Sequence, residues 1–156
     1  MITVHSATTA DQIDIARELI REYAALPHVA GRWLDADREI AELPGAYAPP
    51  RGAILLANQD GNVLGCGCLR PFDEPGVCEM KRLYVRPDTR RRGVGEILIR
   101  ALVDEASALG YFTMKLDTAP ELTEAQSLYH RLGFTRIPHY HDRLLPDDVC
   151  FQRSLA

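Results

Sequence analysis

The sequence has no apolar run approaching the roughly 20 residues that a membrane-spanning helix needs, and its N-terminus lacks a basic stretch followed by an apolar one. We therefore expect no membrane segment, no export signal and a cytoplasmic location. Internal repeats and low-complexity tracts are also absent. A chain of 156 residues is long enough for one hydrophobic core and short for two, so residues 1–156 are expected to form a single domain.

Cysteine is scarce, with four residues in the chain. Cys66 and Cys68 alternate along an apolar run, which would place both on one face of a strand. A zinc site would need a partnering histidine or a second close cysteine pair at a suitable spacing, and the sequence has neither. We expect these two thiols, with Cys78 and Cys150, to be small buried side chains that stay reduced in the cytosol, and we expect no metal site.

Positive charge is in the minority, because the net charge is -4, and this argues against nonspecific binding to nucleic acid. The distribution of charge is more informative than the total. Residues 79–100 contain seven basic and three acidic side chains, whereas residues 1–45 contain four basic and eight acidic ones. We therefore expect an anionic ligand near the middle of the chain, and leave open whether the acidic first third faces a cation.

Hydrophobic periodicity predicts an alternation of strands and helices. Strands are predicted at residues 1–5, 53–57, 63–69, 77–85, 112–116, 134–137 and 149–155, and helices at residues 9–26, 34–43, 93–110 and 122–132. The order β-α-α-β-β-β-α-β-α-β-β predicts an α/β (α+β) domain, in which one twisted mixed β-sheet is flanked by helices. The two middle strand-helix-strand steps should each bring parallel strands together through right-handed crossovers.

The most informative segment covers residues 79–95, where a strand is followed by a basic turn and then at once by a helix. A helix N-terminus presents unpaired backbone N–H groups and a partial positive charge, which suit a phosphate group. Gly93 and Gly95 would let the oxygens of a ligand approach the backbone closely. Forked donors and further charge come from three adjacent arginines, Arg90, Arg91 and Arg92.

The basic turn can also be compared with other phosphate-binding motifs and with a surface charge cluster. A P-loop would continue with Gly-Lys-Ser/Thr, and a dinucleotide fingerprint would have a third glycine, and neither occurs here. Three arginines could also form a nucleic-acid patch or a solvated surface cluster. The flanking strand and helix favour the phosphate site, because they supply a geometry that a random run of charge lacks.

The turn resembles the pyrophosphate-binding signature of the GNAT superfamily of acetyl-CoA-dependent N-acetyltransferases, (Gln/Arg)-x-x-Gly-x-(Gly/Ala), in Arg90-Arg91-Arg92-Gly93-Val94-Gly95. The preceding Leu83-Tyr84-Val85-Arg86-Pro87 is similar to the LYV.P phrase of that superfamily. Ala125-x-x-Leu128-Tyr129-x-x-Leu132-Gly133-Phe134 resembles its A-x-x-L-Y-x-x-x-G-F helix and strand. Two separate motifs in the correct order make the match specific, and the element order agrees over essentially the whole chain.

The resemblance implies transfer of an acetyl group from acetyl-CoA to a primary amine, of a small molecule or an amino acid, by direct attack in a ternary complex. It implies that the strand ending at Val85 splays from the strand at residues 112–116, often at a β-bulge, and that the pantetheine arm pairs with backbone groups of Leu83 and Val85. The implied cofactor-binding residues are Leu83, Tyr84, Val85, Arg90, Arg91, Arg92, Gly93, Val94 and Gly95. No cysteine lies where a covalent relay would be expected, so we expect no acetyl-enzyme.

Two catalytic residues follow from the same resemblance. Glu79 occupies the position of a general base, which would remove the proton that keeps an amine from attacking. The alternative is that Glu79 pairs with a neighbouring Arg or Lys while a water chain takes the proton. Tyr129 occupies the position of the general acid near the departing CoA sulfur, and the alternative is a core tyrosine with its hydroxyl at the rim.

Several features limit the match. The asparagine that many relatives carry before the last helix is missing from residues 117–124, which puts cofactor contacts by this loop in doubt.

His139 and His141 are expected at the exposed surface, and Trp33 and Tyr47 are expected to anchor the acceptor wall in the core. Protein or peptide N-acetylation and a noncatalytic CoA-binding sensor remain alternative functions. The sequence leaves open whether the chain forms a homodimer.

Overall fold

The computed structural model describes residues 1–89 and 91–155. The elements are β1 (Thr3–Ser6), α1 (Ala10–Ala24), α2 (Pro27–Ala30), α3 (Ala36–Ala41), η1 (Gly45–Tyr47), β2 (Ala53–Gln59), β3 (Asn62–Pro71), β4 (Val77–Val85), η2 (Pro87–Thr89), α4 (Val94–Ala108), β5 (Thr113–Thr118), α5 (Thr123–Arg131), β6 (Thr135–Ile137) and β7 (Val149–Ser154). The predicted order is confirmed, and α2 is an additional helix of a single turn. No helix among the described residues is long and apolar enough to cross a membrane.

The strands form one seven-stranded sheet in the order β1-β2-β3-β4-β5-β7-β6. Only β4 and β5 run parallel as neighbours, and the other described pairs are antiparallel, so the expected mixed sheet is present. One expectation is wrong, because β6 does not pair with β5. β7 lies between them and pairs with β5 along its whole length, Thr113–Thr118, which leaves β6 at the edge.

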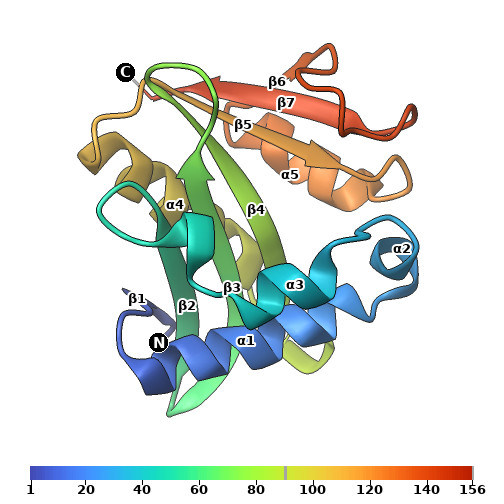
Figure 1. Ribbon diagram of the computed structural model, residues 1–156. Coiled ribbons are helices and arrows are strands. Elements are labelled where there is room, and N and C mark those ends of the chain that lie inside the picture. The colour runs from blue at the N-terminus through green and yellow to red at the C-terminus, as the bar shows by residue number, and fades with distance from the viewer. Residues whose placement is uncertain (90, 156) are drawn as a thin grey trace.

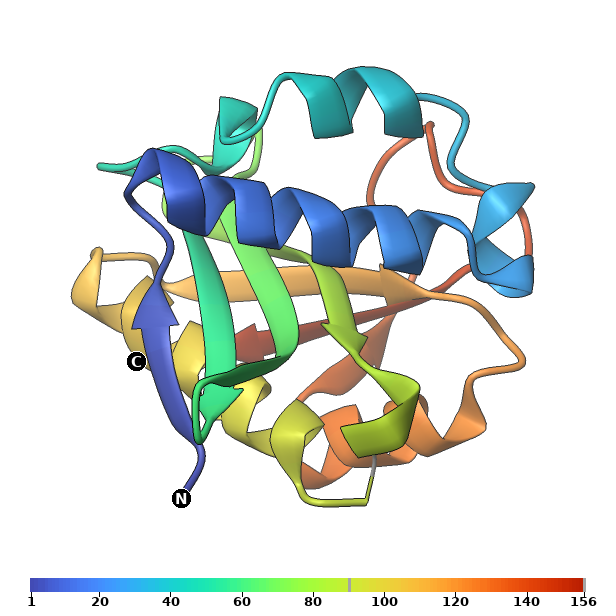
Figure 2. The same cartoon turned by 90° about the horizontal axis from the view of Figure 1, so that it is seen from below.

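Helices cover both faces of the sheet, with α1 and α3 on one face and α4 and α5 on the other (Figures 1 and 2). The core beneath α1 and α3 includes Leu19, Ile20, Ile40, Ile54, Leu56, Cys66, Cys68 and Tyr84. The core beneath α4 and α5 includes Leu55, Leu98, Leu102, Met114, Tyr129, Phe134 and Phe151. All four cysteines are free and buried, as expected, and burial raises the pKa of the Cys66 thiol to about 12.

β4 and β5 separate after a short stretch of pairing, and the cleft described below lies at this separation. Their register covers Val77–Glu79 against Thr113–Lys115, and the described strands do not pair beyond it. On its other side, β4 is irregular where the register with β3 shifts between Cys66 and Cys68, and there Arg82 has a φ of 57°. The predicted splay and bulge are therefore confirmed. On the β5 side, the second half of β4 has no neighbouring strand among the described residues, whereas its other side stays paired with β3.

Candidate active site

A cleft of about 1020 Å³ opens where β4 leaves β5. One wall is β4 itself, from Met80 to Val85, and the opposite wall comes from the end of β5, the following loop and the start of α5. The remaining walls are the segment around α2, from Val29 to Asp35, and the β6–β7 loop, from His141 to Leu145. The cleft is therefore lined both by Leu83-Tyr84-Val85, which precedes the basic turn, and by Ala125 and Tyr129 of the second motif, although these residues lie on different elements.

The predicted cofactor residues fall into two groups. Leu83, Tyr84 and Val85 line the cleft, as the resemblance implies. The second group begins α4, where Gly93 is the N-cap with a φ of 76°, a left-handed conformation that favours glycine. Residues 91–95 do not line the cleft, which reaches Val85 and ends short of them. Arg90 lies outside the described residues.

The start of α4 has the open surface that a phosphate needs. A Cβ built on Gly93 meets no atom within 4 Å, and one built on Gly95 meets only side-chain carbons of Leu128 and Val85, at 3.8 and 3.9 Å. The amides that follow Gly93 are in the first turn of a 15-residue helix, where backbone N–H groups have no partner within the helix. Arg91 and Arg92 are both exposed beside this turn. The residues present therefore fit a pyrophosphate group.

Glu79 is a buried carboxylate held from two sides. Its side chain is 1% exposed, Tyr140 donates a hydrogen bond to Oε2 at 2.6 Å, and Arg70 Nε donates to Oε1 at 3.1 Å. Burial by itself would raise the pKa of Glu79, but the charge of Lys81 and the contacts with Tyr140 and Arg70 outweigh it and hold the pKa below its ordinary value. Glu79 is therefore ionised at neutral pH and has little direct access to solvent.

His141 lies next to this carboxylate and departs from the expectation of an exposed loop residue, because its side chain is only 15% exposed. Its Nδ1 accepts a hydrogen bond from the Arg143 backbone N–H at 3.1 Å. Nε2 is buried, has no hydrogen-bond partner among the described residues, and lies 3.7 Å from Oε2 of Glu79. Burial lowers the pKa of His141, so the ring is neutral at physiological pH. His139, by contrast, is exposed as expected.

Tyr129 both lines the cleft and belongs to the core. Its side chain is mostly buried, and its ring packs edge-on against Phe134 with the centroids 5.8 Å apart. Burial raises the pKa of Tyr129, so its phenol keeps its proton at neutral pH. The hydroxyl makes no hydrogen bond to another side chain among the described residues. Tyr129 thus presents a protonated phenol at the cleft while its ring contributes to packing.

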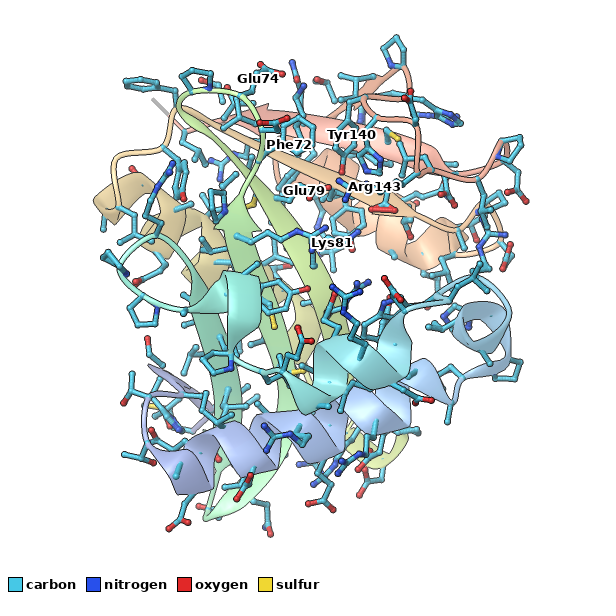
Figure 3. All side chains as sticks on the ribbon, in the orientation of Figure 1. Phe72, Glu74, Glu79, Lys81, Tyr140 and Arg143 are labelled. Carbon is cyan, nitrogen blue, oxygen red and sulfur yellow. The ribbon has the colours of Figure 1, made fainter. Side chains whose placement is uncertain are left out.

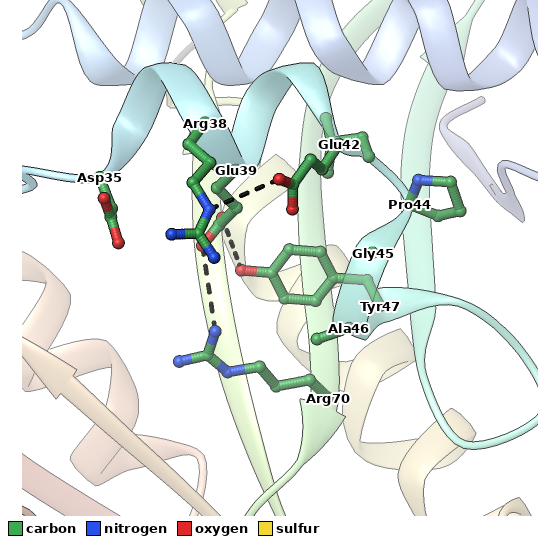
Figure 4. Close-up of a pocket in the computed structure, with 10 residues that line it drawn as sticks. Asp35, Arg38, Glu39, Glu42, Pro44, Gly45, Ala46, Tyr47 and Arg70 are labelled. Atoms are coloured by element: carbon green, nitrogen blue, oxygen red, sulfur yellow. Dashed lines mark hydrogen bonds and ion pairs between the residues drawn. The ribbon is translucent and has the colours of Figure 1, made fainter.

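The wall of the cleft formed by α3 and the segment before it is fixed to the bulge of β4 by Arg82. The guanidinium makes two hydrogen bonds of 2.9 Å with the Glu39 carboxylate of α3 and stacks 3.6 Å from the ring centroid of Trp33. Tyr47 donates a hydrogen bond of 2.8 Å to the same carboxylate, and Arg70 lies 3.9 Å from it, next to a small pocket beside α3 (Figure 4). Tyr47 therefore anchors the segment in the core, as expected, whereas Trp33 also lines the cleft.

The sequence model of the family described as "Acetyltransferase (GNAT) family" matches residues 14–134, which is most of the chain. An uncharacterized N-acetyltransferase of Schizosaccharomyces pombe is 36% identical over 143 residues, which cover 90% of this chain and 88% of that protein. The chain belongs to the GNAT family of acetyltransferases. It is therefore an acyltransferase, and its fold is the one that the resemblance implied.

Two further GNAT relatives bear on the site. An "IAA acetyltransferase" of Azospirillum brasilense is 34% identical over 56% of this chain and 57% of its own length. A Salmonella typhimurium structure solved with acetyl-CoA has a TM-score of 0.72 and 24% identity, covering 99% of this chain and 94% of its own, and therefore shows the shared fold. Acetyl-CoA is the acetyl donor of the family.

Several residues of this GNAT site were not predicted from the sequence. Arg70, Tyr140 and His141 surround Glu79, and Lys81 Nζ is paired with Asp117 Oδ1 at 2.9 Å across the gap between β4 and β5. Figure 3 shows Glu79, Lys81, Tyr140 and Arg143 gathered where β4 meets the β6–β7 loop. The one signal in the sequence was the concentration of ionisable and aromatic types at residues 139–143, and nothing there indicates which strand they contact. Among the described residues, no group of His, Cys, Asp and Glu is arranged to hold a metal ion.

Proposed function

We propose that this GNAT protein transfers the acetyl group of acetyl-CoA to a primary amine of a small molecule, amino acids included, by direct attack in a ternary complex. The observation that carries the proposal is the cleft at the splay of β4 and β5, which Leu83, Val85 and Tyr129 line together. Acetyl-CoA bound along β4 would then have its thioester beside Tyr129 of α5. The rest of the cavity would hold the acceptor amine.

The proposed donor site has two parts. The start of α4, from Gly93 to Gly95 with the neighbouring Arg90, Arg91 and Arg92, would hold the pyrophosphate through backbone N–H groups and guanidinium charge. Backbone groups of Leu83 and Val85 would pair with the amides of the pantetheine arm, as an added strand does. Affinity would then come mainly from main chain, and side chains would be free to act on the acceptor.

Glu79 is the proposed general base. A protonated amine has no lone pair, and its pKa lies about three units above neutrality, so a proton must leave before attack on the thioester. Glu79 is ionised and can accept a proton, but its carboxylate is covered, so we infer that the proton arrives through the Tyr140 hydroxyl or a water molecule. The alternative is that Glu79 holds Arg70 and Tyr140 in place and water alone removes the proton.

Tyr129 is the proposed general acid. When the bond to sulfur breaks, negative charge moves onto the CoA thiolate, and a phenol beside it can donate its proton. The raised pKa of Tyr129 supports this role, because the residue stays protonated at neutral pH. The position of its ring on the cleft wall supports it as well.

A small acceptor is favoured by an ion-pair link between two walls of the cleft. Arg32, after α2, forms ion pairs with Asp147 and Asp148 of the β6–β7 loop, and so joins two walls across the acceptor side. A protein substrate would need an open groove at this place. The name of the related IAA acetyltransferase also favours a small molecule.

A panel of small amines, amino acids and peptides, each mixed with acetyl-CoA, tests the proposal. We expect CoA release to depend on an amine from the small-molecule part of the panel, with an acetylated product of the corresponding mass. Faster turnover of peptides would favour protein acetylation instead. Binding of acetyl-CoA without turnover of any amine would favour the noncatalytic sensor and contradict the proposed function.

A further inference from the structure

We propose that the acceptor amine also carries a carboxylate, and that the guanidinium of Arg143 binds this carboxylate on the β6–β7 loop. The inference rests on the proposed function, since Arg143 and its neighbour His141 line the acceptor side of the same cleft. It assigns a binding site to a loop that neither cofactor motif includes. Three observations support it: the pairing of cations in the cleft, the state of His141, and the places of the acidic groups.

The cations that line the cleft differ in whether they are already paired. Four of them have carboxylate partners: Arg32 with Asp147 and Asp148, Arg70 with Glu79, Lys81 with Asp117, and Arg82 with Glu39. Arg143 is the fifth, and among the described residues it has no ion pair. Its side chain is exposed at the cleft and can make charge-assisted hydrogen bonds to a ligand without breaking a contact within the protein.

His141 fixes the turn that presents this arginine. Because Nδ1 accepts the Arg143 backbone N–H, the proton of the neutral ring is assigned to Nε2. That N–H is buried beside the cleft and unsatisfied, at 3.7 Å from Glu79, which is beyond hydrogen-bond distance. Because Nε2 is covered, the ring acts on a ligand only indirectly, by holding the turn from which the Arg143 side chain lines the cleft.

The acidic side chains that line the cleft do not form an ion pair with Arg143, so its positive charge is not neutralised by them. The lining carboxylates that have no ion pair among the described residues are Asp35, Glu121 and Glu124, and they belong to the α3 and α5 walls. Glu79, the proposed base, lies close to the β6–β7 loop through Tyr140. An acceptor whose carboxylate is bound at Arg143 would therefore have its own ammonium group directed toward the side of this wall where Glu79 lies. A guanidinium fork suits the planar, two-oxygen carboxylate.

The test compares an α-amino acid with its carboxamide, which keeps the amine and side chain and removes the negative charge. We expect Arg143→Gln to lower the ratio of kcat/KM for the acid to kcat/KM for the amide by at least tenfold, mainly through KM, and Arg143→Lys to lower it less because the charge remains. Using the ratio within each enzyme cancels the difference in amine pKa between the two acceptors. Arg136→Gln is the matched control, since Arg136 is exposed on β6 and does not line the cleft.

Binding of the two acceptors to the protein with CoA, measured by calorimetry, separates this inference from the proposed function. Acetylation of amines with an acid-to-amide ratio that Arg143→Gln leaves unchanged would overturn the carboxylate site while the proposed function stands. Absence of turnover for any amine would contradict the proposed function. Carboxylate-dependent binding that is lost in Arg143→Gln but kept in Arg136→Gln would still support the site, and equal binding by both variants would refute it.

Discussion

The Tyr140 hydroxyl donates a 2.6 Å hydrogen bond to Oε2 of Glu79, although the two residues are 61 positions apart in the sequence. Arg70 holds the other oxygen of the same carboxylate. The contact joins β4 to the β6–β7 loop, which also carries His141 and Arg143. A change at either residue should therefore affect both the ionisation of the Glu79 carboxylate and the position of the β6–β7 loop.

Glu79→Gln should lower turnover at neutral pH and restore it as the pH approaches the pKa of the acceptor amine. The reason is that a free base form of the amine needs no general base. The measurement is the pH profile of kcat for wild type and variant with one amine. A profile identical in shape to that of wild type would leave proton removal to water and give Glu79 a structural role.

Tyr140→Phe removes one hydrogen bond to the buried carboxylate without changing its charge. We expect the free energy of unfolding to fall by about 1.5 to 3 kcal/mol, the range for a hydrogen bond to a charged group. If Tyr140 also relays the proton, kcat at neutral pH should fall in parallel. Urea denaturation and kcat measured on one preparation check both effects, and a variant as stable as wild type would show that the contact contributes little.

Tyr129→Phe removes only the hydroxyl from a ring whose edge packing should survive. General acid catalysis of this kind is typically worth ~100- to 10,000-fold. We expect kcat at saturating substrates to fall by at least roughly tenfold, equivalent to about 1.4 kcal/mol of transition-state stabilisation, with little change in acetyl-CoA affinity. A variant with normal turnover and a lower melting temperature would instead assign Tyr129 to the core.

Acetyl-CoA should raise the free energy of unfolding of the wild type by about 2.7 kcal/mol at a concentration of 100 times its Kd. Gly95→Val should lose most of this gain while its apo form stays folded, because a Cβ there makes only ordinary contacts. Gly95 is a cleaner probe than Gly93, whose positive φ would strain any substitute. Thermal unfolding with and without acetyl-CoA is the measurement.

Gly31→Val is the matched control for that experiment, since a Cβ at Gly31 meets no atom within 4 Å and the residue lies far from α4 in the sequence. It should keep the full gain with acetyl-CoA. Normal stabilisation of Gly95→Val would show that the pyrophosphate does not bind at the start of α4. The wild-type gain should also weaken at high salt, because part of the attraction is electrostatic.

Asp117→Asn should be destabilising at pH 6, and the destabilisation should shrink as the pH falls below 3.8. Burial alone would raise the pKa of Asp117, but Lys81 outweighs it and lowers the pKa below the ordinary value of 3.8. Between the pKa of Asp117 in the folded chain and its pKa in the unfolded chain, the unfolded chain binds a proton that the folded chain does not. The stabilisation by ionised Asp117 is therefore fully present above the unfolded-state pKa and is lost as the pH falls through the folded-state pKa. Urea denaturation of both proteins at several pH values gives the difference, and a pH-independent difference would contradict the charge effect.

The fold was largely predictable from the sequence, because its signals are local. The Thr9 capping box begins α1 as predicted, with Gln12 supplying both reciprocal contacts. Gly110 and Gly133 have φ values of 92° and 93°, in agreement with their predicted place after α4 and α5. The pairing of β7 between β5 and β6 was not predictable in this way, because strand order depends on contacts far apart in the chain.

The sequence by itself determined the family of this protein, since the strand, basic turn and helix at residues 79–95 are adjacent along the chain and their spacing is visible in one dimension. Only the tertiary structure decided what surrounds Glu79, because Arg70, Tyr140 and His141 arrive from β3 and the β6–β7 loop. A side chain's burial and pKa depend on such neighbours, and periodicity carries no record of them. The same holds for Arg143, which unlike Arg32, Arg70, Lys81 and Arg82 has no acidic partner among the described residues. Ion pairing of this kind depends on contacts between distant segments, so no single segment of the sequence contains it.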